Sequence, residues 1–303
     1  MRQDNLEILE DTLNILAKGY YTTNSKIVKL KLSQKQMAEI QVFLPDDIEI
    51  INEKEDFECI HAIDRVRIGC ENIDSFTLAR KRSENTYFFS KGKQTTVLVL
   101  NLANPVNPGG GVRRGSKAQE EDLCRKSSLL LSLESQEARR YYDYNRSLNT
   151  YMGSDALVIT PQVEIIKDEK GNLLEDTVLV SVMTCAAPML RYGMAGMTDQ
   201  QYRAMMYRRI VGMLKVAAYL GYEVLVLGAF GCGAFRNDAR VVSDLFYKAL
   251  KEFSYGGMGA KEFFRCIDFA VMDHSYNQYN FNEFCRNFIN FYKDEDTPQY
   301  MND

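Results

Sequence analysis

The sequence has few of the residues from which metal and disulfide sites are built. It contains two histidines, His61 and His274, and its seven cysteines are scattered with no Cys-x-x-Cys pair. Zinc sites need clustered thiolates or imidazoles, and disulfide frameworks need cysteines in even number at regular spacing. We therefore predict neither a metal site nor a disulfide scaffold. The pattern is typical of reduced thiols in a cytoplasmic protein.

Long apolar runs and a strong charge bias are also missing. No stretch approaches the roughly 18 apolar residues that a membrane-spanning helix needs. The N-terminus, MRQDNLEILEDTLNIL, carries acids at amphipathic spacing rather than the apolar core of a signal peptide. The formal net charge of −4 argues against a protein that coats a polyanion. With 303 residues, 46% of them hydrophobic, the chain is expected to form a packed globular core.

Short apolar runs alternate with helical patterns along most of the chain. Strands are predicted at 95–104, 155–166, 178–188, 223–230 and 266–273, the second of them at an edge or split in two by Pro161. Helices are predicted at 5–18 and 34–42, from 118 through the 130s, after a capping box at Thr198 and Gln201, after Asp238, and at 279–292. This order predicts an α/β sheet, largely parallel and covered on both faces. We expect one globular unit over 73–303, with residues 1–72 as a helical extension packed on it.

Two glycine-rich loops each follow a predicted strand and precede a predicted helix. The first is NPGGGVRRGSKA (107–118), and the second is GAFGCGAFRND (228–238). In open α/β sheets, ligands bind at the carboxyl ends of strands, where loop N–H groups and helix N-termini attract phosphate. The first loop is not a Walker A motif, because Ser116 stands where the lysine belongs. The second lacks the third glycine of the Rossmann fingerprint, since Arg236 takes its place.

The first loop leads into Gln119, Glu120 and Glu121 at the start of a predicted helix. On their own, such residues are ordinary dipole partners of a helix N-terminus. Neighbouring residues on a helix point about 100° apart. We therefore expect the two carboxyl groups to have different roles rather than to flank one bond as an acid–base pair. A helix N-terminus favours ionised glutamate, whereas a general acid needs its proton, and the sequence leaves this conflict open.

The spacing of three glycines, seven residues and QEE resembles the signature of microbial-type poly(ADP-ribose) glycohydrolases. The likeness extends over most of the chain and includes VLNLANPVNPGGG, AQEEDLCRKSSLLLSL, SVMTCAAP and GAFGCGAFRND. It implies a macrodomain-like three-layer α/β/α sandwich with a mixed, largely parallel sheet and an ADP-ribose cleft across the strand ends. It also implies hydrolysis of the ribose–ribose O-glycosidic bonds of poly(ADP-ribose), releasing ADP-ribose, without a cofactor.

The same resemblance implies the site residues. Glu121 would be the catalytic group, acting as general acid and then as base, and Glu120 would bind ribose hydroxyls beside it. Phe235 would position the distal ribose. The implied ligand-binding residues are Asn104, Gly109, Gly110, Gly111, Val112, Gln119, Gly231, Cys232, Gly233, Ala234 and Phe235.

Two other functions remain open at this point. One is a non-catalytic reader of ADP-ribose or binder of NAD metabolites, against which the presence of both glutamates argues. The other is a hydrolase of mono-ADP-ribose linkages on protein or nucleic acid. A thiol nucleophile at Cys232 is not favoured, because neither histidine lies near it in the sequence. The expected partners are poly(ADP-ribose) or ADP-ribosylated macromolecules, with ADP-ribose as product, no membrane, and a monomeric protein.

Overall fold

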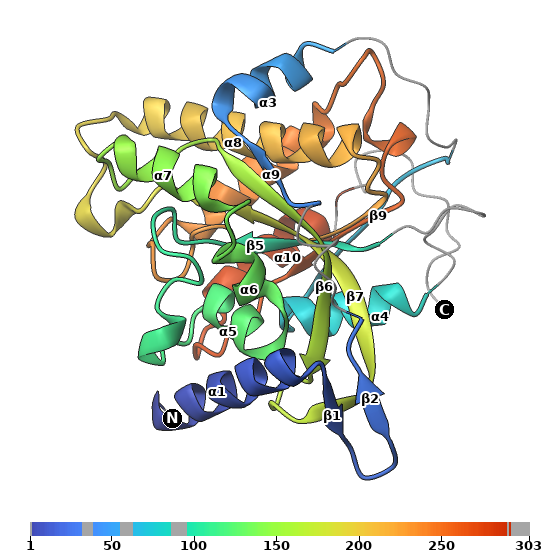
Figure 1. Ribbon diagram of the computed structural model, residues 1–303. Coiled ribbons are helices and arrows are strands. Elements are labelled where there is room, and N and C mark those ends of the chain that lie inside the picture. The colour runs from blue at the N-terminus through green and yellow to red at the C-terminus, as the bar shows by residue number, and fades with distance from the viewer. Residues whose placement is uncertain (1, 32–38, 55–62, 86–95, 290, 292–303) are drawn as a thin grey trace.

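A seven-stranded mixed sheet forms the centre of the protein (Figure 1). The computed structural model describes residues 2–31, 39–54, 63–85, 96–289 and 291. In spatial order the strands are β3 (Gln41–Phe43), β6 (Leu157–Lys167), β7 (Leu173–Cys185), β5 (Leu98–Leu102), β8 (Val224–Gly228), β9 (Cys266–Ala270) and β4 (Arg67–Glu71). Strand β6 is antiparallel to both of its neighbours, β3 and β7, and every pairing from β7 to β4 is parallel. A separate hairpin joins β1 (Tyr20–Thr22) and β2 (Ile27–Lys29).

Helices cover both faces of this sheet, which makes three layers. One apolar core lies under α3 (Pro45–Asn52), α8 (Asp199–Tyr219), α9 (Ala239–Lys251) and α10 (Tyr279–Phe288). The other lies under α1 (Arg2–Lys18), α4 (Ser75–Ser83), α5 (Gln119–Lys126), α6 (Leu129–Leu133) and α7 (Arg139–Ser147). Strand β5 alternates between the two, because Leu98 and Leu100 enter the first core and Val99 enters the second. The predicted α/β/α sandwich is confirmed.

Three predicted elements differ from the structure. The helix expected from Ala118 through the 130s is two helices, because the backbone of Ser127 forms a β-bridge with Ile165 and so leaves the helical path. The strand around Pro161 is one strand, not two and not an edge strand. The pairing of β6 with β7 shifts register between Thr160 and Val163, so the proline falls in a bulge where no N–H is needed. The helix expected at 34–42 gives way to β3 at its end, and residues 34–38 lie outside the described residues.

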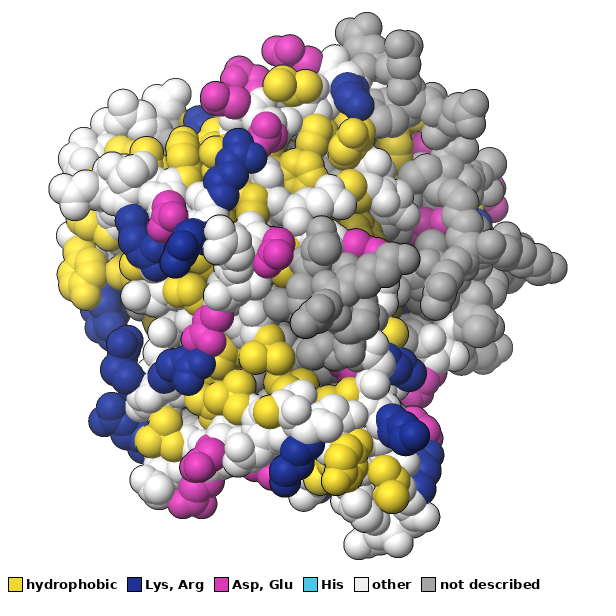
Figure 2. All heavy atoms as spheres, viewed as in Figure 1, with side chains coloured by type: hydrophobic (Ala, Val, Ile, Leu, Met, Phe, Trp, Pro, Cys, Tyr) yellow, Lys and Arg dark blue, Asp and Glu magenta, His cyan; other side chains and the backbone are white. Residues whose placement is uncertain are grey.

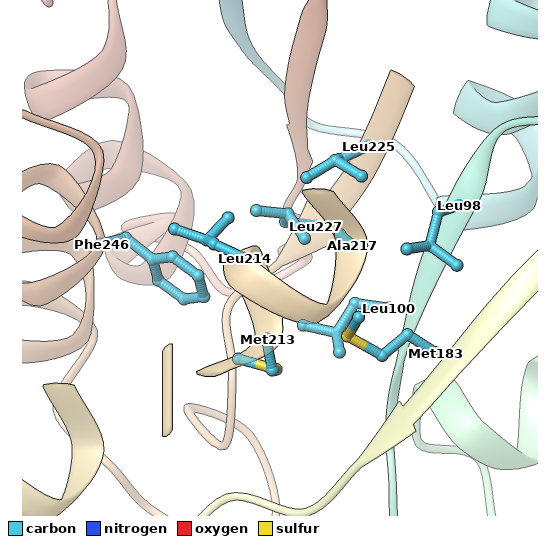
Figure 3. Close-up of a pocket in the computed structure, with 9 residues that line it drawn as sticks. All are labelled: Leu98, Leu100, Met183, Met213, Leu214, Ala217, Leu225, Leu227 and Phe246. Carbon is cyan, nitrogen blue, oxygen red and sulfur yellow. The ribbon is translucent and has the colours of Figure 1, made fainter. Parts of the chain in front are cut away.

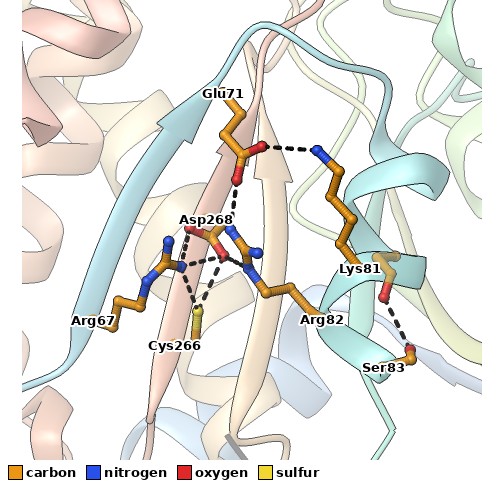
Figure 4. A network of polar contacts seen from close by, with 8 residues as sticks. Arg67, Glu71, Lys81, Arg82, Ser83, Cys266 and Asp268 are labelled. Carbon is orange, nitrogen blue, oxygen red and sulfur yellow. Dashed lines mark hydrogen bonds and ion pairs between the residues drawn. The ribbon is translucent and has the colours of Figure 1, made fainter. Parts of the chain in front are cut away.

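Residues 1–72 contribute the two outermost strands, β3 and β4. Strand β4 is fastened to β9 by a buried carboxylate (Figure 4). Asp268 accepts hydrogen bonds from Arg67 Nη1 at 2.7 and 2.9 Å and from Arg82 Nε of α4 at 2.5 Å. A side chain at Gly69 would not fit, since its Cβ would lie 2.5 Å from Asp268 Oδ1. The proposed boundary at residue 72 stays a prediction, and the strands before it belong to the same sheet.

A small internal cavity of about 10 Å³ lies between β5, β8 and α8 (Figure 3). Apolar side chains line it, among them Leu98, Met213 and Leu227. Its volume is about that of one water molecule, and an apolar lining offers water no hydrogen-bond partners. It is therefore a packing defect of the core and far too small for a nucleotide.

Candidate active site

Gln119 fastens the first turn of α5 to the carboxyl end of β5. Its Oε1 accepts a hydrogen bond from the backbone N–H of Leu102 at 2.8 Å. Its Nε2 donates to the carbonyl oxygen of Leu100 at 2.7 Å and to the hydroxyl of Ser75 on α4 at 3.1 Å. The helix therefore starts at a fixed place at the carboxyl end of β5. The two glutamates that follow are fixed with it.

Glu120 lies almost completely buried, with 3% of its surface exposed. Its Oε2 accepts a hydrogen bond from the backbone N–H of Asn104 at 2.8 Å, and its Oε1 accepts one from Asn101 Nδ2 at 3.4 Å. Burial raises the pKa of this carboxyl group to about 8, even though the Asn104 N–H favours the charged form. The charge of neighbouring Glu121 acts in the same direction as burial. Burial thus favours the protonated form of Glu120.

Glu121 is held by one oxygen only. Its Oε1 accepts a hydrogen bond from the backbone N–H of Gly111 at 2.8 Å. Its buried Oε2 has no hydrogen-bond partner among the described residues, and 8% of the residue's surface is exposed. This carboxyl group is fixed in position and has one oxygen available for chemistry.

The two carboxyl groups meet on the backbone of Gly110. A Cβ at this position would lie 2.6 Å from Glu121 Oε1 and 2.8 Å from Glu120 Oε2, and the residue has a φ of +58°. A side chain is therefore excluded both by space and by backbone conformation. Although adjacent helical residues start out in different directions, their carboxyl groups reach the same turn, and only that of Glu121 has an unpartnered oxygen among the described residues.

The second glycine loop is braced from below by Asn237, which is 4% exposed. Its Oδ1 accepts a hydrogen bond from Tyr202 Oη at 2.8 Å, and its Nδ2 donates to the carbonyl oxygens of Pro188 at 2.8 Å and Gly231 at 3.0 Å. Above this brace the backbone is open, because an added Cβ at Gly233 would meet no described atom within 4 Å. The loop is thus supported on one side and exposed at Gly233.

Both glycine loops follow the carboxyl ends of their strands, on the left in Figure 1. Their strands β5 and β8 are neighbours and run parallel. Intermediate loops connect them: a Cβ at Gly231 would lie 2.5 Å from Ala187 Cβ, and one at Gly153 would lie 3.6 Å from Ala186 and 3.7 Å from Pro105. The loops that follow β5 and β8 therefore belong to one cluster at the carboxyl ends of these strands.

Comparison with known proteins identifies the family. Residues 9–168 match the family model described as microbial-type PARG, catalytic domain. The chain belongs to the microbial-type poly(ADP-ribose) glycohydrolases. A crystal structure of the poly(ADP-ribose) glycohydrolase of Thermomonospora curvata, bound to the inhibitor ADP-HPD, is similar with a TM-score of 0.80 and 27% identity, over 94% of this chain and 100% of that one. The Deinococcus radiodurans poly(ADP-ribose) glycohydrolase in complex with ADP-ribose has 31% identity and a TM-score of 0.71, over 86% of this chain and 97% of that one. No curated protein matches the chain significantly.

Several residues that the sequence assigns to this glycohydrolase's ligand are already engaged with the protein. The side-chain amide oxygen and nitrogen of Gln119 are both hydrogen-bonded to strand β5. Asn104 Oδ1 accepts from the N–H groups of Val106 and Asn107 at 3.0 and 2.9 Å, which closes a turn before the glycines. Val112 is fully buried, and its backbone N–H and carbonyl oxygen are hydrogen-bonded to Gly109 and Gly115. Ligand contacts of these residues remain predictions.

In the second loop, two residues that were predicted to bind the ligand differ in exposure. Phe235 is half-buried and packs against the core beneath α8, whereas Ala234 is exposed. Cys232 is buried, which raises the pKa of its thiol far above the usual value. A thiolate nucleophile is therefore disfavoured here, and the backbone of this loop is its chemically useful part.

Sequence reasoning missed two buried asparagines that support the site, Asn101 and Asn237. Asn101 lies on β5, fully buried, between Glu120 and the hydroxyl of Thr184 on β7, to which its Nδ2 donates at 3.2 Å. A polar residue inside the apolar run LVLNL is the signal that could have found it, since buried amides need partners. Asn237 carries no such signal, because a loop asparagine is ordinary.

Proposed function

We propose that this glycohydrolase cleaves the ribose–ribose O-glycosidic bonds of poly(ADP-ribose) with Glu121 as its single proton-transferring group. One observation carries the assignment: Glu121 has one oxygen fixed by the Gly111 N–H and a second, buried oxygen without a partner among the described residues. A carboxyl group held in this way keeps one oxygen uncommitted for proton transfer to a bound substrate. The relatives crystallised with ADP-ribose and with ADP-HPD support the substrate class.

The reaction then needs only one carboxyl group for both proton transfers. The glycosidic C–O bond breaks, its electron pair goes to the leaving ribose oxygen, and that oxygen takes the proton of Glu121. The resulting carboxylate accepts a proton from water while the water oxygen bonds to the anomeric carbon. The diphosphate of the substrate helps to stabilise the cationic centre between these steps.

Glu120 is proposed to bind ribose hydroxyls beside the reacting bond. Its two oxygens are oriented by Asn104 and Asn101, so the carboxyl group cannot swing toward another partner. A protonated carboxyl group can donate one hydrogen bond and accept others, which suits a pair of sugar hydroxyls. The proton on Glu120 also avoids placing two negative charges against Gly110 once Glu121 has given up its own proton.

The glycine loops are proposed to hold the rest of ADP-ribose. The turn at 109–111 approaches the ribose, and the loop at 231–235 approaches the diphosphate with its N–H groups. Figure 2 shows Lys and Arg side chains gathered down the left edge of the viewed face, near α7 and the loop that carries the 3-10 turn η2 (Val112–Arg114). On this loop, Arg113 is paired with Glu134 at 2.7 Å, while Arg114 and Lys117 are exposed. These side chains would attract a polyanionic polymer to the site.

We further propose that the protein acts as a monomer in the cytoplasm, on poly(ADP-ribose) or ADP-ribosylated macromolecules. The cysteines that the structure describes are all unpaired, which suits a reducing compartment. In the described part of the chain, no helix combines the length and apolar character needed to cross a membrane.

Glu121→Gln tests the catalytic assignment. The amide keeps the shape of the side chain and can still accept from Gly111, but it has no proton to give to the leaving oxygen. We expect release of ADP-ribose from the polymer to fall by roughly a thousandfold or more, within the range that loss of acid–base catalysis produces. The dissociation constant for ADP-ribose, measured by calorimetry, should change little. Turnover lost in Glu120→Gln but kept in Glu121→Gln would reverse the two roles.

A substrate comparison separates this function from its alternatives. The purified protein is incubated with poly(ADP-ribose), with mono-ADP-ribosylated protein and with ADP-ribosylated DNA, and the products are resolved by chromatography. We expect free ADP-ribose from the polymer. Binding without release from any of the three would indicate a reader, and release only from the mono-modified substrates would indicate a different hydrolase.

A further inference from the structure

Helix α1 is anchored to two separate parts of the catalytic layer. Thr12 Oγ1 donates a hydrogen bond to the carbonyl oxygen of Arg125, at the end of α5, at 2.5 Å. Lys167 Nζ, from the end of β6, donates to the carbonyl oxygen of Ile8 at 3.0 Å and to Thr12 Oγ1 at 2.8 Å. Both Thr12 and Lys167 are buried. The second half of the helix is thus fixed, and its first turns extend over the turn η2.

The first residues of α1 bind the far side of the glycine turn. Arg2 Nε donates to the carbonyl oxygen of Arg114 at 2.8 Å, and Asn5 Nδ2 donates to that of Gly115 at 3.0 Å. Gly115 has a φ of +72°, and a Cβ there would lie 2.7 Å from the carbonyl oxygen of Arg2. The approach is so close that only glycine fits beneath the helix.

The glycine turn at 111–116 also fixes the position of Glu121. The N–H groups of Arg114 and Ser116 donate to the carbonyl oxygen of Gly111 at 2.9 and 3.2 Å, so Gly111 is tied to the segment that α1 holds. The N–H of Gly111 then donates to Glu121 Oε1. Hydrogen bonds and the short backbone segments between them therefore connect Asn5 to the carboxyl group of Glu121. Asn5 and Arg2 both precede residues 9–168, the part that matches the family model.

We propose that Asn5 of α1 is a positioning residue for Glu121. By holding the carbonyl oxygen of Gly115, Asn5 keeps the turn at 111–115 closed and the Gly111 N–H aimed at Glu121. The inference rests on the proposed function of Glu121. Misplacement of a catalytic group by about 1 Å costs on the order of a hundredfold in rate, so a modest loosening of the turn has a measurable effect.

Asn5→Ala is the decisive variant. We expect kcat on poly(ADP-ribose) to fall roughly tenfold while KM changes less than about twofold, because the turn is loosened and not lost. Gly115→Ala, which pushes α1 off the turn, should reduce kcat further. Gln3→Ala is the matched control on the same helix, since Gln3 bonds only to Glu7 among the contacts of its side chain that the structure gives. It should keep the kcat of the unaltered protein.

Two further measurements keep the test decisive. Thr198→Ala removes a helix cap on α8, away from the glycine turn, and controls for general loss of stability. Amide hydrogen exchange of the segment 110–116 should accelerate in Asn5→Ala and not in Gln3→Ala. Since exchange needs no substrate, a protein inactive on the polymer would overturn the proposed function and leave this comparison intact. Unchanged exchange, or a kcat loss in Thr198→Ala equal to that in Asn5→Ala, would overturn the positioning role.

Discussion

Two glycines of this protein are needed for opposite reasons. Gly110 faces inward, where both carboxyl groups occupy the space that a side chain would need. Gly233 faces outward, where no described atom lies within reach of an added Cβ. The first position is thus constrained by the protein itself, whereas the second would be constrained only by a ligand that closely approaches the loop.

Alanine at each position should separate these two constraints. We expect Gly110→Ala to lower kcat roughly a hundredfold and to destabilise the fold, because the carboxyl groups must move. Gly233→Ala should leave the melting temperature unchanged and weaken ADP-ribose binding about tenfold, because the methyl group meets the diphosphate. Calorimetric titration and thermal unfolding measure both. Undiminished affinity in Gly233→Ala would remove this loop from the binding site.

The buried carboxyl group of Glu120 gives the protein a pH-dependent stability. Its pKa is about 8 in the folded chain, against 4.5 for an ordinary glutamate. The folded state therefore binds more protons than the unfolded state between these values, and its stability falls as pH rises from about 4.5 to about 8. Above pH 8 the full cost of burying the charge is present.

Glu120→Gln should abolish this dependence. An amide has no charge to bury, and Asn101 can turn its Oδ1, which has no partner among the described residues, toward the new NH₂ group. We expect the variant to gain stability relative to the unaltered protein between pH 5 and pH 8.5, by on the order of a few kcal/mol. Urea unfolding at the two pH values measures the difference. The exposed Glu137→Gln serves as control, and equal pH dependence in all three proteins would contradict the burial argument.

At the scale of helices and strands, the sequence predicted the elements that their own residues determine. The runs at 98–102, 224–228 and 266–270 are short, apolar and bounded by polar or glycine residues, so their pattern alone indicates strands. Strand β3 has only three residues and depends on β6 for its existence. The break between α5 and α6 comes from a bridge to β6, which is a contact between distant residues. No local pattern encodes either of these.

The site divides in the same way. Glu120, Glu121 and both glycine loops were predicted from the spacing of a motif, because these residues lie close together in the chain. The contacts that orient them come from elsewhere: Ser75 binds Gln119, Tyr202 binds Asn237, and Asn5 binds the glycine turn. These pairs are 44, 35 and 110 positions apart, so only the folded chain reveals them.

The cap of α8 is an element whose cause is entirely local. Thr198 accepts a hydrogen bond from the Gln201 N–H at 3.2 Å, and the Gln201 side chain accepts one from the Thr198 N–H at 2.9 Å. Thr198→Ala should cost about 1 kcal/mol of stability, which lowers the melting temperature by roughly 2 °C in a chain of this size. Activity at a temperature well below melting should be unaffected. A large loss of activity would mean that α8 transmits strain to the loops it supports.

For the whole molecule, the first 72 residues are expected to be indispensable. They supply both outermost strands of the sheet, and their removal would expose β6 and β9 as unpaired edges. We expect residues 73–303 produced alone to be aggregated or unfolded, as judged by circular dichroism and size-exclusion chromatography. Adding residues 1–72 as a separate chain should not fully restore the fold. A soluble, cooperatively melting fragment would support the boundary at 72.

The pairing of β4 with β9 also determines when the sheet can be completed during synthesis. Arg67 lies opposite Cys266, so a strand made early waits for one made almost two hundred residues later. Until then Asp268 has not been translated, and the two arginines that will surround it remain in solvent. Pairings this distant slow folding, since the chain entropy is lost before the contacts form. On the ribosome, the nascent protein therefore carries an unfinished sheet edge that a chaperone can recognise until its final strands emerge.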